Sequence, residues 1–226
     1  MTSQPHTAPT PSLSRTEQRH PDTGGLDSMS SLELVSLMNR EDHRAIDAVD
    51  RILPQLAALV DEAVARMRRG GVVHYFGAGT SGRLAVLDAA ELLPTFNLPE
   101  GMVNAHIAGG SRAIVHAVEN SEDSRDQGRE DAAQVGSDDI VLGLAASGAT
   151  PYVHAALVAS ANAGAYTALI TSNPDAPLAV LVDAVLVADT GPEVLTGSTR
   201  LKAGTALKVI LNAFSTALMV QSGRVW

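Results

Sequence analysis

The chain has 226 residues, a formal net charge of −9 and no cysteine. This length can bury a sizeable core as one large domain, or as one domain with a helical appendage. The absence of cysteine excludes disulfides, thiolate zinc sites, iron–sulfur clusters and a cysteine nucleophile. The acidic balance argues against nucleic-acid partners, and 3% aromatic residues leave little for stacking on bases or sugars. We therefore expect a soluble, acidic α/β protein.

Residues 1–15 carry three prolines and no apolar stretch, so we expect a disordered tail and no signal peptide. The most apolar later run, 176–188, is too short to cross a bilayer and is interrupted by Asp183. These features predict no membrane segment and a cytoplasmic location.

Apolar residues recur at spacings of three and four over residues 30–69, which predicts helix up to Gly70-Gly71. After this point strand-like runs alternate with helical stretches. This order predicts an α/β fold, with a parallel sheet of about five strands and helices on both faces. We expect a helical segment over 16–70 and the sheet domain over 71–226. The expected strands are 72–76, 102–107, 139–144, 166–171 and 184–188, and the clearest helices are 83–93, 152–163 and 201–220.

The first expected strand runs into the glycine-rich loop 77–82, which opens a helix. Free N–H groups and the helix dipole favour an anion at such a position. Ser81 could cap the helix or donate to a phosphate oxygen, and the sequence leaves both roles open. The loop also fits G-x-G-x-x-G, but the second strand ends without the acid that a ribose hydroxyl needs. NAD is therefore disfavoured, while a 2′-phosphorylated cofactor is barely compatible.

A second loop of small and hydroxyl residues, 145–150, follows the third expected strand and precedes Pro151. Ser147 and Thr150 could each be helix caps or phosphate ligands. Ligands of parallel sheets bind beyond the carboxyl ends of the strands, so two such loops favour one small phosphorylated ligand. The Gly- and Thr-rich segment 191–205 reads as a further binding loop.

Other chemistry has little support. The seven histidines show no metal-ligand spacing, and no G-x-S-x-G motif occurs. Lys202 and Lys208 are the only lysines, and either could neutralise a ligand phosphate or lie on a helix surface. Taken alone, Glu91 and the acidic run 119–126 are more typical of solvated surface carboxylates.

Eight stretches, taken together in this order, resemble the N-acetylmuramic acid 6-phosphate etherase family of the sugar-isomerase (SIS) domain superfamily. The resemblance covers roughly residues 16–224 and includes the motif GAGTSGR at 77–83. The matching stretches are 16–21, 77–83, 87–96, 107–110, 119–123, 145–152, 172–175 and 191–205.

The resemblance implies a SIS-type, flavodoxin-like fold and cleavage of the D-lactyl ether of N-acetylmuramic acid 6-phosphate, a step in cell-wall sugar recycling. It implies that Glu91 protonates the leaving lactate oxygen and that Glu122 removes the C2 proton. It implies no metal and no redox cofactor, and a homodimer with the site close to its interface. The implied phosphate and sugar contacts are Gly79, Thr80, Ser81, Ser147, Gly148, Thr150, Glu193 and Ser198.

The chain departs from the family pattern at three points. His20 stands where the family usually has asparagine, and Leu92-Leu93 replaces a small or proline pair beside Glu91. Family members also usually continue into a small C-terminal helical part, which we expect to be absent after Trp226. Two alternatives stay open: a non-catalytic phosphosugar sensor such as the glucokinase regulatory protein, and an aldose–ketose isomerase. Lactate release would separate the etherase from both.

Overall fold

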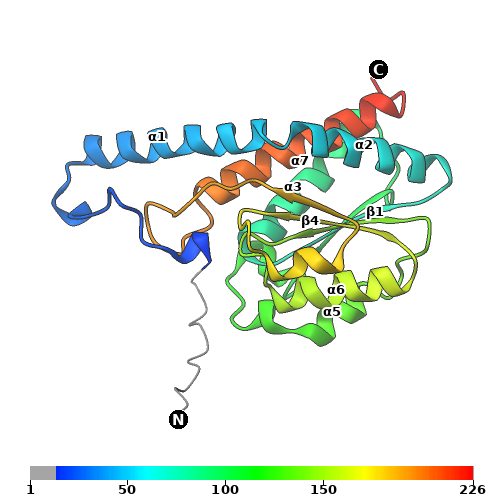
Figure 1. Cartoon of the computed structure of the whole chain (residues 1–226). Helices are drawn as coiled ribbons and strands as arrows, with labels where there is room; N and C mark the ends of the chain where they lie inside the picture. The colour runs from blue at the N-terminus through cyan, green and yellow to red at the C-terminus, as the bar shows by residue number, and fades with distance from the viewer. Residues whose placement is uncertain (1–13, 226) are drawn as a thin grey trace, which may run out of the picture.

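A computed structural model describes residues 14–225 and contains one five-stranded sheet in the order β2-β1-β3-β4-β5 (Figure 1). Every strand pair is parallel, which confirms the predicted α/β fold. The strands are β1 (Val73–Gly77), β2 (Val103–Ile107), β3 (Ile140–Leu144), β4 (Tyr166–Thr171) and β5 (Ala184–Val187).

Helices cover both faces of the sheet (Figure 1). The face that carries Val73 and Tyr75 packs beneath α1 (Ser31–Asp50), α2 (Leu53–Arg68), α3 (Gly79–Phe96) and α7 (Lys202–Gln221). The alternate residue, Phe76, points to the opposite face, where α6 (Pro151–Asn162) packs beside α5 (Arg125–Asp131). The two cores follow from the two-residue period of strands, since successive side chains point to opposite faces. The short elements are α4 (Arg112–Val115), η1 (Arg15–Glu17), η2 (Leu26–Ser28), η3 (Ser121–Asp123) and η4 (Pro177–Leu181).

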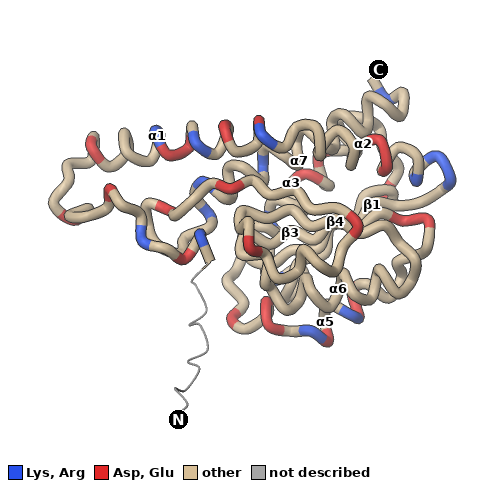
Figure 2. Tube along the Cα trace, viewed as in Figure 1, with Lys and Arg blue, Asp and Glu red and all other residues tan. Residues whose placement is uncertain are grey.

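The helical stretch predicted over 30–69 is divided in two. Ser30 begins α1 with a reciprocal capping box to Glu33, and α1 ends at Asp50. Acidic and basic residues recur along α1 (Figure 2). Pro54 lacks an N–H, and its ring would clash with the carbonyl four residues earlier, that of Asp50, if one helix continued. The apolar periodicity therefore runs across a break that proline imposes.

The helix after β1 begins earlier than expected, at Gly79 instead of Arg83. Its N-cap is Ala78, so Ser81 lies in the first turn and the capping interpretation of Ser81 is wrong. Between β2 and β3 the chain forms only the short helix α4, the turn η3 and the seven-residue helix α5. α3 also ends three residues later than expected, at Phe96, and the remaining expected strand and helix bounds differ from the structure by at most two residues.

A buried ion pair joins α1 to the start of α7. Lys202 Nζ lies 2.5 Å from Glu41 Oε2, and both side chains are almost fully buried. His20 Nε2 lies 3.0 Å from the same carboxylate oxygen, so the segment before α1 is attached to the same cluster. Lys202 is therefore neither a surface residue nor available to a ligand phosphate.

The N-terminal tail predicted as disordered falls mostly on residues 1–13, which lie outside the described residues. Ser14 and Arg15 are described, and Arg15 forms a 2.8 Å ion pair with Asp189.

Among residues 14–225, α7 is long and apolar enough to cross a bilayer by length and composition. In the fold, 56% of that window is buried, as in the core helix of a globular domain.

Candidate active site

The two predicted phosphate loops leave adjacent strands at the same edge of the sheet. The chain runs outward from β1 to β2 and then returns to place β3 on the other side of β1. Gly77, the last residue of β1, is in register with Leu144, the last residue of β3. The loops 78–82 and 145–150 therefore flank the point where the strand order reverses, which is where parallel sheets bind their ligands.

The glycines of the first loop are required by close packing. A Cβ on Gly77 would lie 2.7 Å from the backbone nitrogen of Gly82, and a Cβ on Gly82 would lie 2.6 Å from Ile107 Cγ1. Gly79 has a φ of +53°, with open space around it. The glycines of the G-x-G-x-x-G pattern thus allow α3 to pack close to β1 and β2. The acid that would complete a dinucleotide-binding fingerprint is absent from the end of the second strand.

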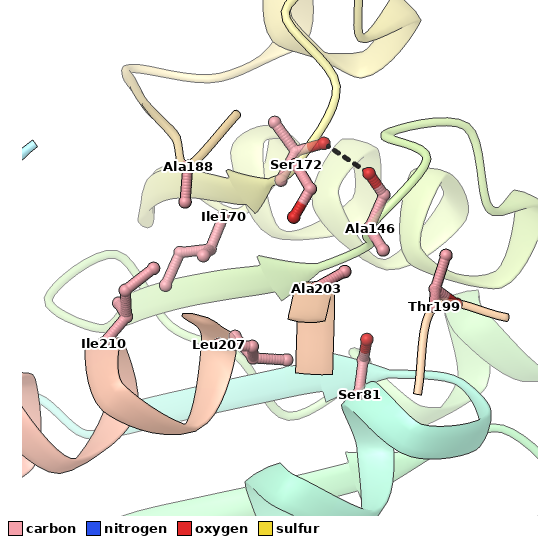
Figure 3. Close-up of a pocket in the computed structure, with 10 residues that line it drawn as sticks. Ser81, Ala146, Ile170, Ser172, Ala188, Thr199, Ala203, Leu207 and Ile210 are labelled. Atoms are coloured by element: carbon pink, nitrogen blue, oxygen red, sulfur yellow. Dashed lines mark hydrogen bonds between the residues drawn. The ribbon is translucent and has the colours of Figure 1, made fainter. Parts of the chain in front are cut away.

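A narrow cavity lies between the two loops and the start of α7 (Figure 3). Ser81 points into it from the first turn of α3, opposite Ala146 and Ser172 (Figure 3). The Ser172 backbone N–H and the Thr171 hydroxyl both donate to the Ala146 carbonyl, each at 3.1 Å. The cavity measures about 10 Å³, the room of one water molecule. Its lining residues are Ser81, Ala146, Ile170, Thr171, Ser172, Ala188, Thr199, Ala203, Leu207 and Ile210.

The second loop contributes to this cavity less directly. Ser147 and Thr150 are outside the cavity lining, and the Ser147 hydroxyl accepts from the Ala149 N–H at 3.3 Å. Thr150 is the N-cap residue of α6, but its side chain makes no capping hydrogen bond. The structure thus places the two loops beside each other, with Ser81 as the hydroxyl that points between them.

Glu122 lines a cleft of about 390 Å³ that also contains Gly79 and Arg83. The Arg83 guanidinium donates to the carbonyls of Ile114 and His116, each at 3.0 Å, and so ties the segment before Glu122 to α3. Glu122 itself lies in the short turn η3. The first phosphate loop and Glu122 therefore face the same cleft.

Glu91 lies elsewhere, on the exposed side of α3, in a cavity of about 290 Å³ between α3 and α7. It is ten residues after Ser81, which corresponds to about 15 Å along the helix axis. Within one chain, Glu91 and Glu122 line different cavities.

Sequence reasoning missed a buried network beneath Glu91. The Asp88 carboxylate accepts from the Tyr75 hydroxyl at 3.1 Å and from the Ser215 hydroxyl at 2.8 Å. Burial raises the pKa of Asp88, and burial beside Asp88 raises the pKa of Tyr75. The available signal was the spacing of three residues between Asp88 and Glu91, which places both on one helix face.

Glu193 is fully buried, and its two oxygens accept from the backbone N–H groups of Lys202 and Ala203 at 3.2 and 3.0 Å. Burial raises the pKa of this carboxyl, and the two N–H donors oppose that rise. In this conformation Glu193 holds the first turn of α7, and its carboxylate is not available to a sugar. Ser198 lies in the preceding turn, and its N–H donates to the Leu195 carbonyl. Thr80 faces α7, where its Cγ2 would lie 3.5 Å from a Cβ on Gly204.

No group of three or more His, Asp or Glu side chains within residues 14–225 is arranged to hold a metal ion.

Solved structures with this architecture come from phosphosugar proteins. A phosphoheptose isomerase from Francisella tularensis superposes with a TM-score of 0.64 at 20% identity, covering 84% of this chain and 98% of that one. The Vibrio vulnificus NanR protein complexed with ManNAc-6P superposes at 0.57 with 17% identity, covering 84% and 66%. The family model of the glucokinase regulatory protein N-terminal SIS domain matches residues 55–161. The sheet and the paired loops thus define a protein with the SIS-type fold.

Relatives with much higher identity place the chain more closely. It is 51% identical over 219 residues to the N-acetylmuramic acid 6-phosphate etherase of Thermobifida fusca (strain YX), covering 96% of this chain and 72% of that protein. It is 48% identical over 214 residues to the etherase of Deinococcus radiodurans, covering 94% and 70%. The chain belongs to the N-acetylmuramic acid 6-phosphate etherase family.

Proposed function

We propose that the chain cleaves the D-lactyl ether of N-acetylmuramic acid 6-phosphate, giving N-acetylglucosamine 6-phosphate and D-lactate. The observation that carries this proposal is the identity of about 50% with etherases over nearly the whole chain. Recycling of cell-wall sugars in the cytoplasm is the setting that fits this reaction.

The proposed chemistry needs one base and one acid. In the ring-opened sugar, C2 lies beside the aldehyde, so its proton is acidic and the C3 ether is placed for β-elimination. Glu122 takes the C2 proton while Glu91 donates a proton to the leaving oxygen, and D-lactate departs. Water then adds to C3 of the enal, Glu91 accepts a proton from it, and C2 is reprotonated. The sum is the addition of one water across the ether, by general acid–base steps.

The phosphate is proposed to bind between the loops 78–82 and 145–150. Its supports are their position where the strand order reverses and the backbone N–H groups at the start of α3. Ser81 is the hydroxyl best placed to contact it, and Gly79, Thr80, Ser147, Gly148 and Thr150 belong to the same two loops.

The separation of Glu91 from Glu122 supports a homodimeric site. A phosphate beside Ser81 would lie about 15 Å from Glu91 of the same chain, far beyond the reach of one sugar. Leu87 and Leu93, on either side of Glu91, are each 47% exposed, so this stretch of α3 is an apolar surface. We therefore propose that a second copy packs near α3 and that its Glu91 completes the site containing Glu122.

A phosphosugar sensor is the second candidate, because the matching family model is that of the glucokinase regulatory protein SIS domain. A sensor would bind the sugar phosphate and release no lactate. An isomerase would exchange the C2 proton with solvent and leave the ether intact.

The test is to incubate the purified chain with N-acetylmuramic acid 6-phosphate and assay D-lactate. We expect release that falls about 10²–10⁴-fold in Glu91→Gln or Glu122→Gln, since each removes one acid–base group. Calorimetric binding of N-acetylglucosamine 6-phosphate should persist in both variants. Glu100→Gln, an exposed carboxyl just beyond α3, is the matched control and should be unaffected. Binding without lactate release by the unmutated chain would refute the etherase proposal in favour of the sensor.

A further inference from the structure

Among the described residues, Lys208 is a cation that forms no ion pair. It lies on the exposed side of α7, and its Nζ donates to the Asn212 side-chain oxygen at 3.2 Å, one turn further along. No described carboxylate oxygen comes within ion-pair distance of it. The other lysine, Lys202, is buried in an ion pair with Glu41, whereas Lys208 is exposed and forms no ion pair.

The cavity beside Lys208 is the one that contains Glu91. It measures about 290 Å³ and lies between α3 and α7. Its walls combine three leucine side chains with one ammonium, one amide and two carboxyls. The lining residues are Leu84, Leu87, Asp88, Glu91, Lys208, Leu211 and Asn212.

Asp88 forms no ion pair with Lys208. Its two oxygens accept from Tyr75 and Ser215, and it lies outside ion-pair distance of the ammonium. The two groups interact only at longer range: burial raises the pKa of Asp88, and the charge of Lys208 opposes that rise. An anion that enters the cavity would therefore meet Lys208 as its available cation.

We propose that this cavity is the subsite for the lactyl arm of the substrate, with Lys208 and Asn212 holding its carboxylate. This inference rests on the proposed function. If Glu91 protonates the C3 ether oxygen, that oxygen lies within hydrogen-bond reach of Glu91, and the lactyl carboxylate lies one carbon beyond it. Lys208 Nζ and the Asn212 amide N–H group donate to this carboxylate, and the leucines contact the lactyl methyl group.

The arrangement makes Lys208 a specificity-determining residue. Sugar 6-phosphates that have a free hydroxyl at C3 lack the carboxylate and gain nothing from this subsite. Lys208 and Glu91 belong to the same copy, so the assignment holds whichever copy supplies the phosphate loops.

The experiment compares two ligands that differ only in the lactyl group. In the Glu91→Gln chain, where turnover is slowed, calorimetry measures the dissociation constants of N-acetylmuramic acid 6-phosphate and N-acetylglucosamine 6-phosphate. We expect the first to bind roughly tenfold more tightly, as one charge-assisted contact at a partly open site would give. Adding Lys208→Met should bring the ratio of the two dissociation constants close to one, whereas Lys208→Arg should retain most of the preference for N-acetylmuramic acid 6-phosphate.

Binding of N-acetylglucosamine 6-phosphate should be equal in all three proteins, which controls for the fold and the phosphate site. An unchanged ratio in Lys208→Met would overturn the subsite. Asn212→Leu is a second test of the subsite and should lower the ratio of the two dissociation constants in part. Lactate assays of the unmutated chain separate the two proposals. If no lactate is released but the ratio of the two dissociation constants depends on Lys208, the etherase proposal alone is refuted. If lactate is released but Lys208→Met leaves that ratio unchanged, the subsite proposal alone is refuted.

Discussion

Gly148 shows how one residue controls a binding loop. Its φ is +67°, and a Cβ at this position would lie 2.2 Å from the Ala176 Cβ. L residues avoid this backbone region, and here the added atom would also push apart the loop after β3 and the loop after β4. The glycine thus permits the close approach that brings these loops beside Ser81.

We expect Gly148→Ala to lower the free energy of unfolding by about 2 kcal/mol or more and to weaken phosphosugar binding, because the loop must move. Gly191→Ala is the matched control: φ there is +71°, but nothing lies within 4 Å of the added Cβ. It should cost about 1 kcal/mol and leave binding unchanged. Urea denaturation and calorimetry with N-acetylglucosamine 6-phosphate measure both effects, and equal behaviour of the two variants would contradict this account.

At the scale of elements, a pair of histidines joins β1 to the edge strand β2. His74 Nδ1 lies 3.1 Å from His106 Nε2, and the His106 ring stacks on Phe76 at 4.3 Å. Burial lowers the pKa of both histidines, and that of His106 falls to about 4, with the neighbouring His74 adding to the effect. The facing carboxylates oppose these shifts, Asp139 at His74 and Asp131 at His106.

His106 makes the free energy of unfolding depend on pH. Below pH 6.5 the unfolded chain binds a proton at His106, whereas the folded chain does so only near pH 4. The free energy of unfolding therefore falls as the pH drops through this window, by on the order of 1 kcal/mol at pH 5 once partial solvent exposure is allowed for. We expect His106→Gln to show a smaller loss of Tm between pH 7.5 and 5 than the unmutated chain. His43→Gln, on the exposed face of α1, should keep the full loss. If His106→Gln loses as much Tm between pH 7.5 and 5 as the unmutated chain, the histidine pair does not contribute to the pH dependence of stability.

At the scale of the whole molecule, the proposed dimer predicts complementation between two inactive variants. If Glu122 of one copy works with Glu91 of the other, a Glu91→Gln/Glu122→Gln heterodimer has one intact site and one doubly mutated site. Co-expression of the two variants in equal amounts should therefore restore about a quarter of the unmutated activity, because half of the dimers are mixed.

Lactate release by the co-expressed variants, against each variant alone, is the measurement. A single-chain site would give no recovery, since every copy lacks one glutamate. Sedimentation of the unmutated chain as a monomer at micromolar concentration would independently contradict the dimer.

The local chemistry of the chain determined the fold class. Short apolar runs that are followed by small and hydroxyl residues and alternate with helical stretches are typical of buried parallel strands with loops at their carboxyl ends. The five strands, α6 and α7 thus lie within two residues of their expected bounds. The start of α3 was misjudged because glycines at its N-terminus hide a helix that packing against β2 imposes.

Only the tertiary structure decided which charges are available to a ligand. Glu193, Lys202 and Lys208 all follow β5 in one polar region, and nothing in their spacing tells them apart. The fold buries Glu193 against the backbone of α7 and Lys202 against Glu41, and it leaves Lys208 open beside Glu91. For the two lysines the outcome depends on α1 and α3, more than a hundred residues away in the chain, so it cannot be read from local pattern. The same holds for the separation of Glu91 from Glu122, which is fixed by where α3 and η3 meet the sheet.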